Sequence, residues 1–172
     1  FNLGKALLAL GRYQEAIARC EQALALKPAF VEAYYLLGNA LQALHRYSDA
    51  TARYEKALAI RPAFAEAHTN LGNALKALHR LDEALPHYAQ ALAIKPDLAE
   101  PEANMGLALL ALGRYAEGWQ PYEARWRLKG VAALPDFQRP LWLGHEDIAN
   151  RHLLIQFEQG LGDAILMSRY VA

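Results

Sequence analysis

The sequence has few of the features that indicate a chemical activity or a charged binding partner. Its 172 residues contain one cysteine, Cys20, which excludes an internal disulfide and a cysteine-cluster metal site. The 18 basic residues balance the 18 acidic ones, so no general attraction to nucleic acid or to an anionic membrane is expected. No apolar run reaches the ~18–20 residues of a membrane span, and no signal-peptide pattern opens the chain. We therefore expect a cytoplasmic protein that binds neither nucleic acid nor membrane.

The most informative feature that is present is a repeat of 34 residues. One glycine recurs at this interval in four units, at Gly4, Gly38, Gly72 and Gly106. Three of the units close on a proline, at Pro28, Pro62 and Pro96. A fixed period of this length is the signature of an architecture built from stacked repeats.

Each unit has the pattern of two helices. In residues 65–98, apolar and small residues follow two stripes of helical spacing, separated by a short break at His79 and Arg80. Pro96 ends the second stripe, because proline lacks a backbone donor and disfavours helix in the residue before it. The small residues Gly72 and Ala84 are expected where the two helices cross closely. The unit is thus predicted to be a helix A, a tight turn and a helix B.

This pattern resembles the tetratricopeptide repeat. The residues that carry the resemblance in the third unit are Leu71, Gly72, Leu75, Ala84, Tyr88, Ala91 and Pro96. The aromatic residue that usually precedes the Leu-Gly pair is His68 here. The resemblance covers residues 1–128 and implies an all-α fold, a right-handed α-solenoid of antiparallel helix pairs. The expected units are a partial repeat at 1–30, repeats at 31–64 and 65–98, and a degenerate capping repeat at 99–130.

The same phase predicts the helices and the core. Cys20 occupies the position held by tyrosine in later units, so we expect a buried thiol. Pro86 and Pro121 fall inside B helices, where we expect a kink or a late helix start. The chain enters its first A helix at Phe1 without a methionine, so a fragment of a longer protein is expected. The predicted helices end near residue 10 in the first unit and then span 13–26, 31–44, 47–60, 65–78, 81–94, 99–112 and 115–128.

The periodicity ends after the fourth unit. Residues 131–151 are predicted to be a linker, and residues 152–157 read as a strand followed by a glycine turn and the start of a helix. From Gly113 onward the sequence is similar to bacterial proteins that join tetratricopeptide repeats to a heptosyltransferase-related glycosyltransferase domain. That resemblance implies that residues 152–172 are the truncated start of an α/β domain. Gly160, Gly162 and Asp163 would then be candidates for cofactor binding, although such glycines also serve ordinary turns.

Repeated asparagines in the A helices are the candidate binding residues. Asparagine is a poor helix former, and its side-chain amide can satisfy the backbone of an extended peptide of any sequence. The arrangement resembles the asparagine ladder of the repeat arm of O-GlcNAc transferase. The alternative is that these residues bridge neighbouring helices or face water. The predicted groove is lined by Asn2, Lys5, Tyr35, Asn39, Asn70, Asn73, Lys76 and Asn104, with further contacts from Gln42 and Thr69.

Three functions are consistent with the sequence. The first is a protein-interaction module that binds an extended peptide or a partner helix in this groove. The second is the substrate-recruiting arm of a larger glycosyltransferase, with catalysis outside this chain. The third is self-association, through the repeat ends or through residues 152–172.

No chemistry is predicted for the chain by itself. No nucleophile–base constellation is present, so catalytic residues, a cofactor and a metal are not expected. His45 and His79 occupy equivalent turns but lie one repeat apart, too far for joint ligation. The carboxylates of Glu32, Glu66 and Glu100 are explained by favourable interaction with helix N-termini.

Overall fold

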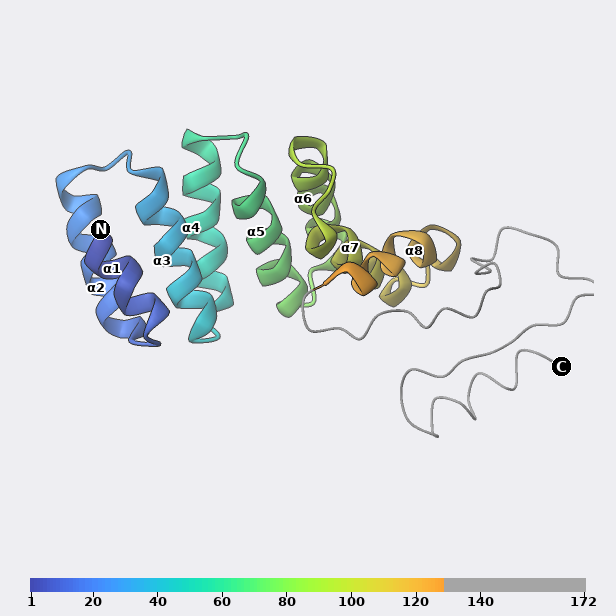
Figure 1. Cartoon of the computed structure of the whole chain (residues 1–172), viewed down its shortest axis with the longest axis horizontal. Coiled ribbons are helices and arrows are strands. Elements are labelled where there is room, and N and C mark those ends of the chain that lie inside the picture. The colour runs from blue at the N-terminus through green and yellow to red at the C-terminus, as the bar shows by residue number, and fades with distance from the viewer. Residues whose placement is uncertain (129–172) are drawn as a thin grey trace, which may run out of the picture. The chain divides into compact units, whose positions relative to one another are not determined.

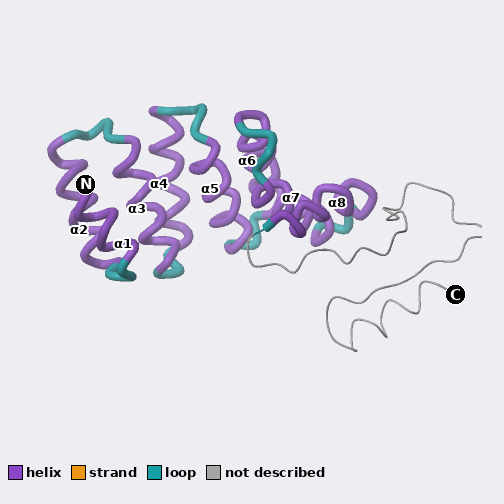
Figure 2. Tube along the Cα trace, viewed as in Figure 1, coloured by secondary structure: helices purple, strands orange, loops and turns teal. Residues whose placement is uncertain are grey.

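The structure, a computed structural model, describes residues 1–128, and these form eight α-helices and a terminal 3₁₀ helix (Figures 1 and 2). No strand occurs in this described range, and the predicted all-α class is confirmed. The linker at 131–151, the strand and the residues Gly160, Gly162 and Asp163 lie outside the described residues, so the domain boundary at 128 stays a prediction. The elements are α1 (Asn2–Ala9), α2 (Tyr13–Leu26), α3 (Val31–Ala43), α4 (Tyr47–Ile60), α5 (Ala65–Ala77), α6 (Leu81–Ile94), α7 (Ala99–Ala111), α8 (Tyr115–Tyr122) and the 3₁₀ helix η1 (Glu123–Arg127).

The odd-numbered A helices end one residue earlier than predicted, because a left-handed residue closes each turn. His45 has a φ of 58° and His79 a φ of 59°, and glycines hold the equivalent places in the first and fourth units. In the second unit the N–H of His45 donates to the carbonyl of Gln42, and the N–H of Arg46 donates to that of Leu41. These two bonds form a Schellman motif. Both histidines are exposed turn residues, as the sequence predicted.

The last B helix differs from the prediction. The α-helix predicted over 115–128 ends at Tyr122, and a 3₁₀ helix follows. A Cβ on Gly106 would lie 2.3 Å from the backbone nitrogen of Tyr122, so the backbone of α8 occupies the space that a tyrosine ring fills in earlier units. Pro121 also withholds a helical N–H at this point. At Pro86, in contrast, α6 runs unbroken from Leu81, and the expected late start is wrong there.

Stacking of the pairs builds the core. Tyr54 and Tyr88 are fully buried, and a Cβ on Gly38 or Gly72 would lie within 2.5 or 2.6 Å of the respective ring. Glycine is thus required where each ring crosses its A helix. Cys20 is also fully buried at the equivalent position, which confirms the predicted core thiol.

The A helices form the inner face of the stack. Helices α1, α3, α5 and α7 contact one another in succession, whereas α2, α4 and α6 each contact the A helix of their own unit and of the next, and α8 contacts α7 and η1. Within residues 1–128 no Cα atom of one B helix lies within 8 Å of a Cα atom of another B helix. Neighbouring A helices are therefore closer together than neighbouring B helices, which places the predicted groove residues on the more tightly packed side.

Candidate functional site

Asparagine side chains on the inner face link one repeat to the next. The hydroxyl of Tyr54 on α4 donates a hydrogen bond of 2.8 Å to Oδ1 of Asn39 on α3. Nδ2 of Asn70 on α5 donates to the same oxygen at 2.8 Å and also lies 3.2 Å from the hydroxyl of Tyr35. The amide oxygen of Asn39 thus accepts one hydrogen bond from its own repeat and another from the following repeat.

The next pair of repeats has the same arrangement. The hydroxyl of Tyr88 donates to Oδ1 of Asn73 at 3.0 Å, and Nδ2 of Asn104 donates to that oxygen at 2.9 Å. We call these two clusters the asparagine bridges: Tyr54–Asn39–Asn70 and Tyr88–Asn73–Asn104. The four asparagines are half-buried. Of the two roles considered from the sequence, bridging between neighbouring helices is the one that this geometry displays.

The bridges differ in one position. Oε1 of Gln42 lies 2.9 Å from the hydroxyl of Tyr54 and is a second acceptor for its one hydrogen. The equivalent of Gln42 one unit later is Lys76, which instead donates from Nζ to Oδ1 of Asn104 at 2.6 Å. Burial lowers the pKa of Lys76, and the nearby Glu100 carboxylate opposes that shift. Burial also raises the pKa of Tyr54 and of Tyr88 well above the ordinary tyrosine value, so both hydroxyls remain donors.

The structure gathers most, but not all, of the predicted groove residues. Asn39 and Asn70 belong to the first bridge, where Asn70 also contacts Tyr35. Asn73 and Asn104 belong to the second, where Lys76 donates to Asn104. Asn2 and Lys5 are exposed on α1 and are joined to neither cluster by a hydrogen bond within the described residues. The assignment of all eight residues to a binding groove stays a prediction.

The position of Thr69 differs from the groove contact predicted for it. Its side chain is buried, and its Oγ1 donates a hydrogen bond of 3.0 Å to the carbonyl of Ala65 one turn earlier in the same helix. The predicted groove contact at Thr69 is therefore wrong, since the hydroxyl is used inside its own helix.

Sequence reasoning missed the ion pairs that close the second and third units. Glu32 pairs with Arg61 and Glu66 pairs with Lys95, from the start of a repeat to its end. Glu100, in the same phase, accepts a hydrogen bond of 2.9 Å from Nδ2 of Asn73. Basic residues that recur at the interval of the repeat could have predicted these ion pairs. The sequence analysis instead attributed the glutamates to interaction with helix N-termini.

A histidine pair was missed as well. Nδ1 of His68 on α5 lies 3.2 Å from Nδ1 of His87 on α6, with the rings stacked at a centroid distance of 5.4 Å. Burial lowers the pKa of His87, and the neighbouring His68 adds to the shift. Because other units carry different residues at these positions, the repeat pattern gave no signal for the pair.

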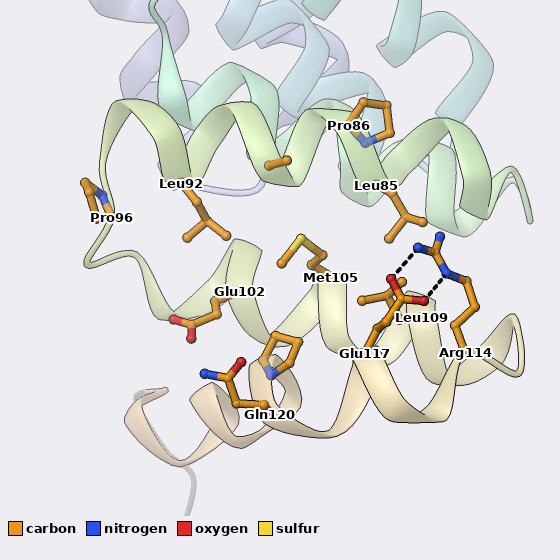
Figure 3. A pocket seen from close by; sticks show the side chains of 12 residues that line it. Leu85, Pro86, Leu92, Pro96, Glu102, Met105, Leu109, Arg114, Glu117 and Gln120 are labelled. Carbon is orange, nitrogen blue, oxygen red and sulfur yellow. Dashed lines mark hydrogen bonds and ion pairs between the residues drawn. The ribbon is translucent and has the colours of Figure 1, made fainter. Parts of the chain in front are cut away.

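A hollow lies on the B-helix side of the fourth repeat. It lies between α6, α7 and α8 with a volume of about 640 Å³. Figure 3 shows Leu85, Leu92 and Met105 directed toward this space, and an ion pair between Arg114 and Glu117 at its edge (2.7 Å). The two edge charges neutralise each other, but Glu102 and Gln120 also line the hollow, so it offers both apolar and polar contact.

Residues 1–128 lack two further kinds of feature. No group of three or more histidine, cysteine, aspartate or glutamate side chains is placed to hold a metal ion there. None of the helices in that range is both long and apolar enough to cross a membrane.

A solenoid of helix pairs, in which a tyrosine ring packs on a glycine where two helices cross, belongs to the class of stacked-repeat proteins. Comparison with family models shows which family of that class this chain matches. The TPR repeat model matches residues 4–45 and 43–79, and the tetratricopeptide repeat model matches residues 65–98. Together these matches cover more than half of the chain, which belongs to the tetratricopeptide-repeat family. They do not support the glycosyltransferase resemblance of the C-terminal residues.

Solved structures agree with this assignment. The chain is similar to the crystal structure of MamA, with 26% identity and a TM-score of 0.69 over 72% of each chain. It is similar to YrrB, "a TPR protein with an unusual peptide-binding site", with 26% identity and a TM-score of 0.66 over 72% of this chain and 63% of that one. The first TPR domain of Spaghetti (RPAP3) shares the fold at 23% identity and a TM-score of 0.64, over 65% of this chain and 89% of that one. Comparison with curated proteins gives no match.

Proposed function

We propose that this chain is a protein-interaction module that binds an extended peptide or a partner helix along the inner face of its A helices. The observation that carries the proposal is the row of half-buried amide, hydroxyl and ammonium groups from Tyr35 to Asn104, which crosses three repeats on that face. The similarity to YrrB, which is described as having an unusual peptide-binding site, supports this proposal.

The bridges hold these groups in fixed orientations before any partner arrives. The amide of Asn70 is held through Nδ2 by Asn39 and Tyr35, and its Oδ1 accepts no hydrogen bond from a described residue. The hydroxyl of Tyr35 accepts from Asn70 and keeps its own hydrogen for donation. A backbone N–H and a backbone C=O of an extended peptide match these two groups, and fixed side chains lower the entropy cost of binding.

Lys76 adds a charged donor to the inner face of the A helices. Its ammonium group has three hydrogens, of which Asn104 takes one. Partial burial strengthens a hydrogen bond from this group to a peptide carbonyl or carboxylate. Since Glu100 lies nearby, the groove favours a neutral or weakly acidic segment over a strongly acidic one.

The test uses substitutions that keep packing and remove one polar function each. A peptide is selected from a random library on the wild-type chain, and its Kd is measured by fluorescence anisotropy. Lys76→Met and Tyr35→Phe should each weaken binding, Lys76→Met by about tenfold or more, because a hydrogen bond to a charged group contributes ~1.5–3 kcal/mol.

Lys56 provides the matched control, since it is an exposed lysine on the B helix α4. Lys56→Met should leave the Kd unchanged. Equal affinity for the wild type, Lys76→Met and Tyr35→Phe would overturn the proposed groove, as would a selective loss of binding in Lys56→Met.

A further inference from the structure

The histidine pair in the third repeat has a geometry that goes beyond packing. His68 and His87 come from the two helices of one unit, α5 and α6, and both are half-buried. Their Nδ1 atoms face each other at 3.2 Å. On the other side of the His68 ring, Nε2 lies 3.0 Å from the carbonyl oxygen of Pro62.

The Pro62 carbonyl determines which nitrogen of His68 carries hydrogen. A carbonyl oxygen only accepts, so Nε2 of His68 is the N–H donor in this contact. In the neutral ring, Nδ1 of His68 then carries the lone pair, and Nδ1–H of His87 donates to it. This is the arrangement found at histidine metal ligands, where a carbonyl or carboxylate holds one ring nitrogen and leaves the other for the metal.

The separation of the two nitrogens fits a shared metal ion. With Zn–N bonds of about 2.0–2.1 Å, two nitrogens 3.2 Å apart subtend an angle of about 100° at the metal, close to tetrahedral. Glu83, one turn before His87, contributes a negative charge, although Arg80 binds that carboxylate at 2.7 Å.

We propose that His68 and His87 form a two-histidine site for a divalent transition-metal ion that prefers imidazole, with Zn²⁺ as the representative, and that the ion links helices α5 and α6. The metal replaces the hydrogen bond from Nδ1–H of His87 to Nδ1 of His68 and lies to one side of the line between the two nitrogens. The proton of His87 moves to its own Nε2, so binding to the neutral pair releases no proton. Solvent water completes the coordination, because the described residues supply no third side chain.

The first experiment titrates Zn²⁺ into the ¹⁵N-labelled full chain and follows the side-chain nitrogens of its six histidines by NMR. The Nδ1 resonances of His68 and His87 should shift together and saturate near one equivalent of metal. A response confined to other histidines, or a response of only one member of the pair, would overturn the proposal. This measurement needs no substitution and does not depend on the stability of a variant.

The second experiment measures Zn²⁺ affinity by competition with a chromophoric indicator. His68→Asn and His87→Asn should each weaken binding by about tenfold or more, comparable with the loss of a supporting partner at characterised metal sites. Zn²⁺ should raise the melting temperature of the wild type and not that of either variant.

His79→Asn is the matched control. This substitution removes an exposed histidine from a turn whose left-handed backbone asparagine also accepts, and it should leave Zn²⁺ affinity unchanged. Unchanged affinity in both His68→Asn and His87→Asn, or a comparable loss in His79→Asn, would refute the two-histidine site.

Discussion

We expect the two asparagine bridges to make unequal contributions to stability, although their asparagines look equivalent in sequence. Asn39→Ala and Asn73→Ala each remove an amide that accepts from a buried tyrosine hydroxyl and from the next asparagine. After Asn39→Ala, the hydroxyl of Tyr54 still has Gln42 as an acceptor at 2.9 Å. After Asn73→Ala, the hydroxyl of Tyr88 has no other acceptor within the described residues.

The magnitudes follow from that difference. A lost hydrogen bond whose partner finds another acceptor costs about 0.5–1.5 kcal/mol, whereas a buried hydroxyl without an acceptor costs about 1–3 kcal/mol. Asn73→Ala should therefore lower the free energy of unfolding by about 1 kcal/mol more than Asn39→Ala does. The gain in helix propensity from asparagine to alanine applies to both variants and cancels in the comparison.

Urea unfolding followed by circular dichroism measures these energies, and a double-mutant cycle isolates the hydroxyl. Tyr88→Phe should cost stability in the wild type but restore part of it in the Asn73→Ala background, because the hydroxyl without an acceptor is removed. Glu100→Ala controls for the additional exposed bond of Asn73. Equal costs for the two asparagine variants within about 0.3 kcal/mol, or a further loss on adding Tyr88→Phe to Asn73→Ala, would refute the reasoning.

Three further predictions concern packing and backbone. Gly72→Ala should destabilise the chain by roughly 1–3 kcal/mol in urea unfolding, because its Cβ would lie 2.6 Å from a buried ring. Gly4→Ala, whose Cβ would have its nearest neighbour at 3.4 Å, should be neutral or stabilising. The opposite order of stabilities would contradict the packing argument. Cys20 should react with a thiol reagent only as fast as the fold opens, because burial raises the pKa of its thiol, and rapid labelling of the native chain would show that the thiol is accessible. His79→Gly should raise the thermal midpoint, with a gain of about 1 kcal/mol, because a φ of 59° costs a non-glycine residue energy; a lower midpoint would mean that the imidazole makes a compensating contact.

The helices were predictable because the signal for them is local and repeated. The first three units supply the same apolar spacing and the same terminal proline, so helix B was placed correctly at residues 13–26, 47–60 and 81–94. The fourth unit broke the pattern at Gly118 and Pro121, and there the length of helix B was overestimated. Its end depends on a close backbone approach to Gly106, which no local pattern encodes.

The polar contacts were harder to predict than the helices. The sequence placed asparagines on one face but did not show that one oxygen is shared between repeats, since that depends on the register of successive A helices. The histidine pair could not be predicted from the sequence for a different reason. His68 and His87 have no repeated equivalents, and only the packing of α5 against α6 brings them together.

The shared oxygen of each asparagine bridge has a consequence for how the stack comes apart. The acceptor belongs to one repeat, while one of its two donors belongs to the following repeat. When one unit unfolds, its neighbour loses a partner for a half-buried amide and becomes easier to unfold in turn. The bridges therefore add to the coupling free energy between adjacent units and sharpen the unfolding transition, so that neighbouring repeats melt together rather than one by one.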